Sequence, residues 1–600
     1  MSLPTRRERW PSRFAYVVAS VSAMIGLGTF LRLPTLVAEF GGVTFFVPYY
    51  FLTLVVGYTM FTLESATGEI YRSGVIAFFH YVYKDFIGFG VLQLVANILS
   101  CGYYNIILGW FLLYTIRSSY SPWNYNTQAY FDEYILNVND RAVITVANIL
   151  SCSIIWVVVF ISIYKGVCHT TKIVYVTLPF PILMMVMLFV RAITLENGLS
   201  SFKDNFYVDV DELLGPRIWI EALGQIMIST SMGFGVAAAY GSYRIKDGFV
   251  MEDAFIVHVI KILVELLSWI TMGCITGHQG WSEDQLSEFD GFQVAFVLYP
   301  NIAQNLAFPY IWNFLFFMFL LILGIDCSHA SVEGIVTCLV DSKRFANYSR
   351  TSITLMTVLT GVFASVVMHF NLHIVSACDY FLTNVWFILG ALGEALVLSL
   401  FYNVGFVYSK LGYWPVAMAH ISWVISPVIS TILFVATGKH LIAILIGIFT
   451  WLFGTLVSMQ TSPYTGTFRS KLYILFLYQG KLFQHHYNET LKMDERQTWF
   501  KFNTLWYICL KFVSVPLLII AVTASFISVF YIPVIKVNSA IFATTGLIFV
   551  LLAILIIFLP RYIPNIYDSL APIEQQPEIL HIDEWMRFWL AKEKRILKNI

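Results

Sequence analysis

Residues 22–34 read Ser-Ala-Met-Ile-Gly-Leu-Gly-Thr-Phe-Leu-Arg-Leu-Pro, a mostly apolar stretch that contains the glycine pair Gly26 and Gly28. A second pair, Gly233 and Gly235, lies in another apolar run. Glycine pairs loosen a helix and free backbone N–H and C=O groups, which lipid cannot satisfy. Such breaks are tolerated where the backbone lines a polar cavity, although small residues also serve simple helix packing. We therefore predict that the two broken segments meet and enclose a site within a membrane.

The composition of the chain excludes an ordinary soluble protein. Its 600 residues are 58% hydrophobic and only 12% charged, whereas soluble domains carry roughly 25% charged residues. Lys and Arg number 36, as do Asp and Glu, so the chain is not expected to bind nucleic acid. We see no catalytic triad and no nucleotide-binding loop, so we do not expect an enzyme. The eight cysteines have no CxxC spacing, which predicts neither a disulfide framework nor a thiolate metal site.

Apolar runs of about 20 residues recur along the chain, as membrane-spanning helices require, and about fourteen spans are predicted. Their approximate extents are 13–37, 43–69, 88–116, 142–164, 171–193, 217–243, 251–276, 309–339, 351–369, 378–404, 414–436, 440–460, 504–533 and 540–560. The broken runs are spans 1 and 6, which open two halves of five spans each. Paired broken helices in corresponding positions are typical of transporters built from an inverted repeat.

The predicted fold class is an all-α polytopic membrane protein with a five-plus-five inverted-repeat core and additional carboxyl-terminal helices. Its segments are an amino-terminal segment 1–12, the ten-helix core 13–404, helices 11–12 at 405–460, a loop 461–503, an extra helix pair 504–560 and a tail 561–600. Lys and Arg gather in the loops on one side, which predicts that this side and both termini are cytosolic. We expect residence in the plasma membrane, with an intracellular membrane as the alternative. The oligomeric state is not predicted.

Several motifs closely resemble the neurotransmitter:sodium symporter family, with order and spacing kept over about 460 residues. They include Trp10-Pro-Ser-Arg-Phe-Ala-Tyr16, Gly26-Leu-Gly-Thr-Phe-Leu-Arg-Leu-Pro34, Ala38-Glu-Phe-Gly-Gly-Val-Thr-Phe-Phe-Val-Pro-Tyr49, Ala295-Phe-Val-Leu-Tyr-Pro300, Leu323-Gly-Ile-Asp326 and Leu400-Phe-Tyr402. The resemblance implies sodium-coupled transport of a small molecule by alternating access. The last 140 residues or so depart from the family's twelve-helix plan, either because the last helix pair is duplicated or because a pair is inserted before it.

The resemblance implies a substrate site at the two breaks, where the amino end of a half-helix suits a carboxylate. Gly26 stands where monoamine carriers place an Asp, which favours a small neutral amino acid or related zwitterion. Tyr104 matches the family tyrosine that contacts the substrate carboxylate, although interfacial aromatic residues are common in membrane proteins. The predicted substrate-binding residues are Ala23, Met24, Gly26, Gly28, Ser100, Tyr104, Ile228, Ser229, Ser231, Phe234, Ser328 and Ser331.

The family's second sodium site maps onto the backbone carbonyls of Ser22, Ile25 and Leu323 and the side chains of Asp326 and Cys327. A carboxylate in the middle of a membrane is costly unless a partner offsets its charge, so Asp326 is expected to bind the ion. Its alternative role is a hydrogen bond between packed helices. Cys327 replaces the usual serine, and a soft thiol is a poor ligand for a hard cation.

The family's first sodium site and its chloride site are altered at several positions. The altered or neighbouring positions are Thr29, Tyr49, Gln225, Ser229, Lys261 and Glu265. We hypothesise that Lys261 replaces the first sodium and Glu265 replaces chloride, which leaves one Na⁺ and no chloride requirement. Two alternatives remain: the pair is a salt bridge that only packs the helix, or it titrates and carries a proton.

Two sets of polar residues match the family's gates. Arg32 and Asp379 match the outer pair, and the inner network maps onto Arg7, Trp10, Tyr243 and Asp341. Arg7 is also explained by the excess of positive charge on the cytosolic side.

Three functional hypotheses follow. The leading one is a sodium-coupled carrier. The second is a ligand sensor or trafficking partner that does not transport, because Thr29, Lys261 and Cys327 depart from the sodium sites. The third is a carrier coupled to protons. The expected partners are the small-molecule substrate and the lipid bilayer.

Overall fold

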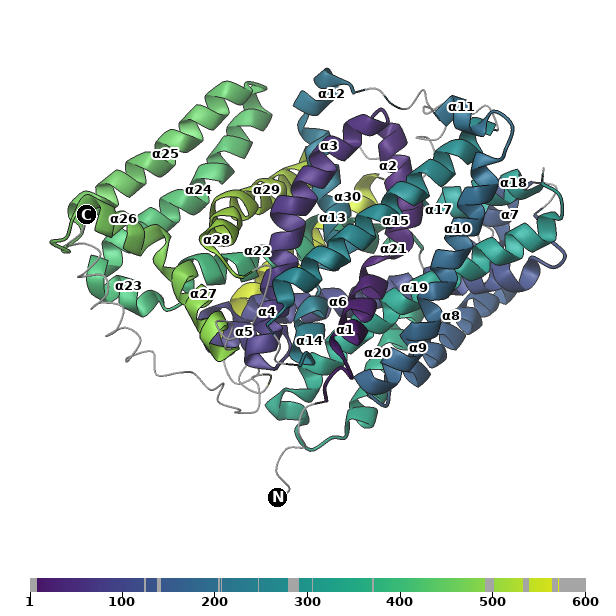
Figure 1. Cartoon of the computed structure of the whole chain (residues 1–600), viewed down its shortest axis with the longest axis horizontal. Helices are drawn as coiled ribbons and strands as arrows, with labels where there is room; N and C mark the ends of the chain where they lie inside the picture. Colours follow the sequence, from purple (N-terminus) through teal and green to yellow (C-terminus); the bar gives the residue numbers. More distant parts are fainter. Residues whose placement is uncertain are drawn as a thin grey trace.

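The computed structural model describes residues 8–123, 126–136, 142–202, 206, 208–245, 248–278, 291–304, 306–369, 372–491, 501–531, 539–563 and 570. Within these residues the architecture is helical (Figure 1). Arg7 and residues 571–600 of the predicted cytosolic tail lie outside the described residues.

The first span is broken where the sequence predicts. Helix α1 (Arg13–Met24) ends at Ile25, whose extended backbone (φ −87°, ψ 95°) cannot continue the helix. The π-helical turn η1 (Gly28–Arg32) and α2 (Leu33–Glu39) follow, and the two halves are bent by 52°.

The sixth span is interrupted between α13 (Pro216–Thr230) and α14 (Val236–Ser242). Ser231, Gly233 and Gly235 all have positive φ values, of 53°, 73° and 74°. A Cβ on Gly233 would collide with the backbone carbonyl oxygen of Phe387. The turn therefore requires glycine at 233 both for its dihedral angles and for a close approach to the tenth span.

The other predicted spans correspond to single or bent helices. They are α3 (Val43–Leu52), η2 (Thr53–Gly57) and α4 (Tyr58–Tyr71) for span 2; α6 (Ile87–Arg117) for span 3; α8 (Ala142–Ile163) for span 4; α9 (Val167–Thr177) and α10 (Pro179–Ile193) for span 5; α15 (Val250–His278) for span 7; α19 (Pro309–Val340) for span 8; α20 (Arg350–His369) for span 9; and α21 (Leu372–Phe381), η7 (Leu382–Trp386), α22 (Phe387–Leu396) and η8 (Val397–Phe401) for span 10.

The carboxyl-terminal helices beyond the predicted core follow in order. They are α24 (Tyr413–Thr437), α25 (His440–Thr461), α28 (Thr504–Cys509), η10 (Leu510–Ser514), α29 (Val515–Tyr531) and α30 (Ser539–Phe558). The segment predicted as a loop at 461–503 contains two further helices, α26 (Phe468–Phe476) and α27 (Tyr478–Thr490). Shorter connecting helices include α5 (Val75–Val82), α7 (Thr127–Tyr134), α11 (Gly198–Phe202), α12 (Val210–Leu214), α17 (Gly291–Gln293), α18 (Tyr299–Gln304) and α23 (Val404–Leu411).

The helices of the structure that are long and apolar enough to span a membrane are fewer than the fourteen spans predicted from the sequence. Eleven helices of the described chain are long and apolar enough to cross a membrane, or twelve if the bent first span is counted. The interrupted α13–α14 pair and α30 are the two predicted spans outside this count. The figure of fourteen therefore stays a prediction.

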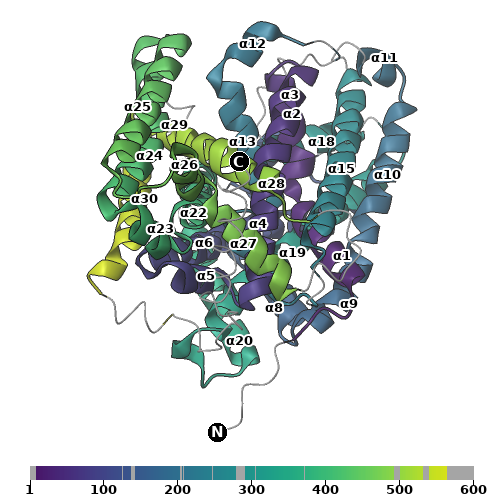
Figure 2. The ribbon, with the colours of Figure 1, turned by 60° about the vertical axis from the view of Figure 1, so that its left-hand side comes forward.

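The extra helices cover the tenth span. Helix α29 packs against α22 and α24, and α30 packs against α6 and α21. The indole of Trp386 donates to the Phe549 carbonyl at 3.1 Å, and Ser514 Oγ donates to the Val55 carbonyl at 2.6 Å. The pair α24–α25 lies at one edge of the molecule (Figures 1 and 2). The tenth span is consequently an interior element, and 94% of its most apolar 18-residue stretch is buried inside the protein.

We expect Gly233→Ala to lower the thermal stability of the detergent-solubilised protein. A side chain in the left-handed region costs about 1–2 kcal/mol, before the collision with the Phe387 carbonyl is counted. Size-exclusion chromatography after heating would measure the change in melting temperature. Gly405→Ala is the matched control, because an added Cβ there meets nothing within 4 Å. Equal melting temperatures for the two variants would contradict a required glycine at 233.

Candidate functional site

The two breaks contact each other through polar side chains of the sixth span. Ser231 Oγ donates to the Ala23 carbonyl at 3.2 Å, and Gln225 Nε2 donates to the Gly28 carbonyl at 3.0 Å. Both carbonyls belong to the interrupted part of the first span. The exposed backbone groups of one break are thus satisfied by the other, as the absence of water in a membrane demands.

Asn97 of α6, in the third span, binds the sixth-span break. It was not among the residues predicted from the sequence. Its Nδ2 donates to the carbonyls of Phe234 and Ser331, at 3.2 and 3.0 Å. The sequence feature that could have identified Asn97 is a side-chain amide inside an apolar run, because polar side chains within spans mediate contacts between helices. Asn97 therefore joins the third, sixth and eighth spans.

The predicted carboxylate contact, Tyr104, lies close to Gly26. Its hydroxyl is buried without a well-formed hydrogen bond, and its polar neighbours include the Leu27 amide and the Cys327 thiol. A Cβ on Gly26 would lie 3.9 Å from that hydroxyl and 2.7 Å from Cys327 Sγ. A larger residue at position 26 would therefore close the gap between the first span and α19.

The other predicted substrate residues have different surroundings. Ser328 Oγ donates to Asn105 Oδ1 at 2.9 Å, and the ring of Phe234 stacks on Phe387 with centroids 3.6 Å apart. Ser100 and Ser229 are buried. Ile228 lies next to Gly28, because a Cβ on this glycine would be 3.4 Å from its Cγ2.

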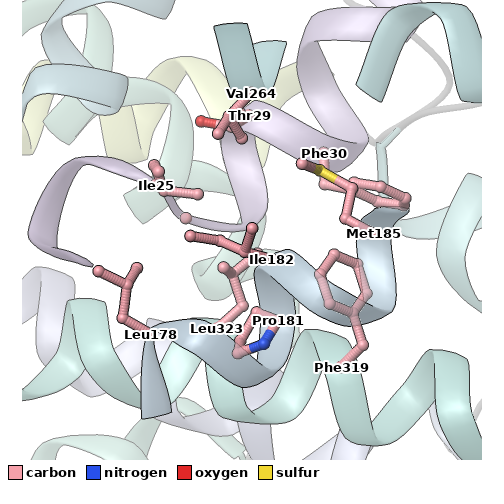
Figure 3. A pocket seen from close by; sticks show the side chains of 11 residues that line it. Ile25, Thr29, Phe30, Leu178, Pro181, Ile182, Met185, Val264, Phe319 and Leu323 are labelled. Atoms are coloured by element: carbon pink, nitrogen blue, oxygen red, sulfur yellow. The ribbon is translucent and has the colours of Figure 1, made fainter. Parts of the chain in front are cut away.

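A small cavity opens beside the first-span break (Figure 3). It is lined by Ile25, Gly26, Thr29, Phe30, Leu178, Pro181, Ile182, Met185, Val264, Phe319 and Leu323. Its free space is about 10 Å³, enough for about one water molecule. Gly26 is the one residue that it shares with the predicted substrate set, so this cavity lies to the side of that set.

Oxygen atoms gather around Asp326 and Cys327 on α19. Asp326 Oδ2 accepts from Ser22 Oγ at 2.6 Å, and Oδ1 accepts from Thr177 Oγ1 at 2.7 Å. Cys327 Sγ faces the carbonyls of Ser22, Ala23 and Ile25 at 3.9, 3.7 and 3.6 Å. Carbonyls freed by a helix break and a carboxylate are the donor set that suits a hard monovalent cation. Thr177 was missed by the sequence analysis, because it comes from the fifth span.

Lys261 and Glu265 form a buried pair one helical turn apart on α15. Lys261 Nζ lies 2.7 Å from Glu265 Oε1, and both side chains are fully buried. Tyr49 joins the pair: its hydroxyl accepts from Lys261 Nζ at 2.9 Å and donates to Glu265 Oε1 at 2.5 Å. Ser229 Oγ of the sixth span is 3.3 Å from the same hydroxyl. Two opposite charges thus lie beside the break, connected to it through Tyr49.

Two acidic residues, Glu64 and Glu394, form a second buried pair near the sixth-span break. The sequence pattern did not single them out. Glu64 Oε1 of α4 accepts from the Gly233 amide at 2.8 Å, and Glu394 Oε1 of α22 accepts from Gln93 Nε2 at 2.9 Å. The two carboxyl groups lie within reach of each other. Both residues could have been identified from the sequence, because Glu64 and Glu394 lie within predicted spans and ionisable residues there are functional candidates by default.

The predicted outer pair is not formed. Arg32 Nη2 instead lies 3.4 Å from Glu221 Oε2 of α13, while Asp379 lies near the Tyr103 hydroxyl. Within the described residues Arg32 and Asp379 form no direct ion pair in this conformation, although the Arg32 charge acts on Asp379, so their assignment to an outer gate stays a prediction. Glu221 is near the amino end of the sixth span, and the sequence pattern gave no indication of its partner.

The described inner positions make hydrogen bonds in two groups, one around Trp10 and Tyr243 and one at Asp341. The Trp10 amide donates to the Tyr243 carbonyl at 2.9 Å, and its indole donates to the Tyr240 carbonyl at 3.0 Å. The Tyr243 hydroxyl is 2.9 Å from Thr337 Oγ1, and Asp341 Oδ2 accepts from the Gly74 amide at 2.9 Å. On the inner side these contacts hold the segment before α1 against α14, and α14 against α19.

Comparison with known proteins assigns the family. The profile of the sodium:neurotransmitter symporter family matches residues 7–149 and 128–462. The chain is 29% identical over 380 residues to a sodium- and chloride-dependent taurine transporter of Bos taurus, which covers 56% of this chain and 61% of the relative. It is 26% identical over 467 residues to the sodium- and chloride-dependent GABA transporter 2 of Mus musculus, with 70% and 77% covered.

A creatine transporter of Torpedo marmorata is 26% identical over 484 residues, with 71% of this chain and 78% of the relative covered. The chain thus spans about three fifths of the bovine relative and more than three quarters of the other two. Residues after 462, which include α26–α30, lie beyond the profile match. Because the matched residues make up most of the chain and contain both helix breaks, this protein belongs to the sodium:neurotransmitter symporter family, a family of membrane transporters and not of enzymes.

Proposed function

We propose that this protein carries a small zwitterion across the membrane with one sodium ion, and that Lys261 and Glu265 take the places of the family's first sodium and of chloride. The observation that carries the proposal is the buried contact of 2.7 Å between Lys261 Nζ and Glu265 Oε1 beside the sixth-span break. A permanent ammonium there supplies the positive charge that a substrate carboxylate needs. A permanent carboxylate supplies the negative charge that chloride would bring.

The surroundings of the pair favour this function over simple packing. The pair contacts Tyr49, and Tyr49 contacts Ser229, which belongs to the predicted substrate set. Glu265 Oε2 and Gln225 Oε1 are buried and have no hydrogen-bond partner within the described residues. Buried polar groups left unpaired cost free energy, so acceptors in such a place are expected to gain a partner during the transport cycle.

Size and charge at the breaks support a small zwitterionic substrate. Gly26 offers no carboxylate to a substrate amine, and the buried Tyr104 hydroxyl is placed to donate to a substrate carboxylate. The relatives are transporters of taurine, GABA and creatine, which are small zwitterions. We infer a substrate of the same class, bound between spans 1, 3, 6 and 8.

We assign the single sodium to the oxygens around Asp326. The hydrogen bonds around Trp10 and Tyr243, together with the lack of a direct Arg32–Asp379 ion pair among the described residues, support an alternating-access cycle in which this conformation is closed on the inner side. We place the Trp10 side of the molecule and both termini in the cytosol, and the protein in the plasma membrane.

Uptake into reconstituted vesicles tests the function. We expect taurine or another small zwitterion to accumulate in proportion to the sodium gradient and with no change when gluconate replaces chloride. Flux that follows pH in the absence of sodium would instead support proton coupling. No flux with any small zwitterion, in vesicles whose protein is folded, would support a ligand sensor.

We expect Lys261→Asn to raise the Hill coefficient for sodium from about one toward two, because a vacated cationic position admits a second ion. Each coupled charge adds about 2.3 kcal/mol per 100 mV, so maximal accumulation should rise more than tenfold if the variant couples both ions. Lys172→Asn, which removes an exposed lysine from α9, is the control. An unchanged sodium stoichiometry in Lys261→Asn would refute the replacement.

We expect Cys327→Ser to lower the half-saturating sodium concentration by about threefold to tenfold, because a hydroxyl oxygen is a better ligand for a hard cation than a thiol. Sodium-dependent thermal stabilisation measures the same affinity without transport. Cys338→Ser makes the same change in the same helix and should have no effect on sodium. If both variants respond alike to sodium, the assignment of Cys327 to the ion site fails.

A further inference from the structure

Helix α27 lies outside the family match and is anchored on the end of the tenth span. Gln479 Nε2 donates to the Leu400 carbonyl at 3.4 Å, and Asn403 Nδ2 donates to the Tyr478 hydroxyl at 3.3 Å. The Tyr402 hydroxyl is 2.7 Å from His486 Nδ1. These contacts fix one face of α27.

The far end of α27 touches the second span. Tyr487 is fully buried, and its hydroxyl donates to Glu69 Oε2 at 3.0 Å. Its ring packs against Phe502 with centroids 4.6 Å apart. Glu69, near the end of α4, is also fully buried. Helix α27 thus supplies a donor to a buried carboxylate of the predicted transporter core.

That carboxylate begins a chain of charges that ends on the first helix. Glu69 Oε2 lies 3.4 Å from Arg244 Nε, and Arg244 Nη1 lies 2.7 Å from Asp253 Oδ2. Asp253 Oδ1 in turn lies 2.6 Å from Nε of Arg13 in α1. Glu69, Arg244 and Asp253 are each almost entirely buried, so loss of one partner would leave a charge uncompensated. The chain of charges therefore binds α1 to α4 and α15 on the side where the inner network is closed.

We propose that Tyr487 is a positioning residue of the inner gate: its hydroxyl holds Glu69 toward Arg244 and so stabilises the closed position of α1. Helix α27, which lies beyond the family match, is then a built-in restraint on inner opening. This inference rests on the proposed alternating-access function. In the proposed cycle, inner opening moves α1 away from α15, on which it packs here, and this movement would break the chain of charges that Tyr487 supports.

Tyr487→Phe tests the role, because it removes one hydroxyl and keeps the ring against Phe502. Cys327 is the reporter, since it faces the α1 carbonyls and becomes reachable from the cytosol when α1 moves. A membrane-impermeant maleimide would be applied to sealed inside-out vesicles without sodium, with labelling read by peptide mass spectrometry. Cys168 is exposed beside the Arg9 carbonyl and serves as the internal reference.

We expect Tyr487→Phe to raise Cys327 labelling, relative to Cys168, about tenfold, the shift expected for a lost hydrogen bond to a charged group. Tyr478→Phe, which removes a hydroxyl from the same helix away from Glu69, should leave labelling unchanged. Glu69→Gln should also raise Cys327 labelling. In the double variant Glu69→Gln with Tyr487→Phe, labelling should be only slightly higher than in the single variant with the larger effect, because both changes act on the same contact.

Unchanged labelling in Tyr487→Phe, or an equal rise in Tyr478→Phe, would overturn the inference. If Tyr487→Phe does not fold, Glu69→Gln and Tyr478→Phe still decide it, because the inference requires the first to raise labelling and the second to leave it alone. Labelling needs neither substrate nor flux. A labelling change without sodium-dependent uptake would therefore reject the proposed function alone, and uptake without a labelling change would reject the gate role alone.

Discussion

The structure depends on one constraint: backbone groups freed by a helix break within a membrane must find partners in the protein. The two breaks satisfy each other through Ser231 and Gln225. The remaining groups of the sixth-span turn are held by neighbouring helices, since Glu64 accepts from the Gly233 amide and Asn97 donates to the Phe234 carbonyl. Spans 2, 3 and 8 are thereby drawn around the breaks.

Charges inside the fold obey a similar constraint. Lys261 has Glu265 and Tyr49, Asp326 has Ser22 and Thr177, and the Lys511 ammonium donates to the Ser399 and Leu475 carbonyls at 2.9 and 3.3 Å. A buried charge with partners on two or three helices fixes the relative positions of those helices. The same groups are candidates for movement, because an ion or a substrate competes for the partners that hold them.

The extra helices change the context of the tenth span. Helices α29 and α30 pack on this span, which is almost entirely buried in the structure. Lys511 and Tyr507 both donate to the Ser399 carbonyl within its π-helical turn η8. Helix α27, beyond the family match, also contacts the tenth span and reaches Glu69 of the second span. The part of the chain beyond the family match is thus connected to the elements that carry the inner network.

The sequence by itself determined the helical class, the places of both breaks and the contact between Lys261 and Glu265. These features are local, because glycine pairs act on their own turn and residues four apart share one helix face. The tertiary structure decided which distant groups meet. Arg32 pairs with Glu221 across 189 residues, and Tyr487 of α27 reaches Glu69 across 418. Such partners depend on how helices pack and on which conformation the molecule adopts. The spacing of residues along one helix determines neither of these.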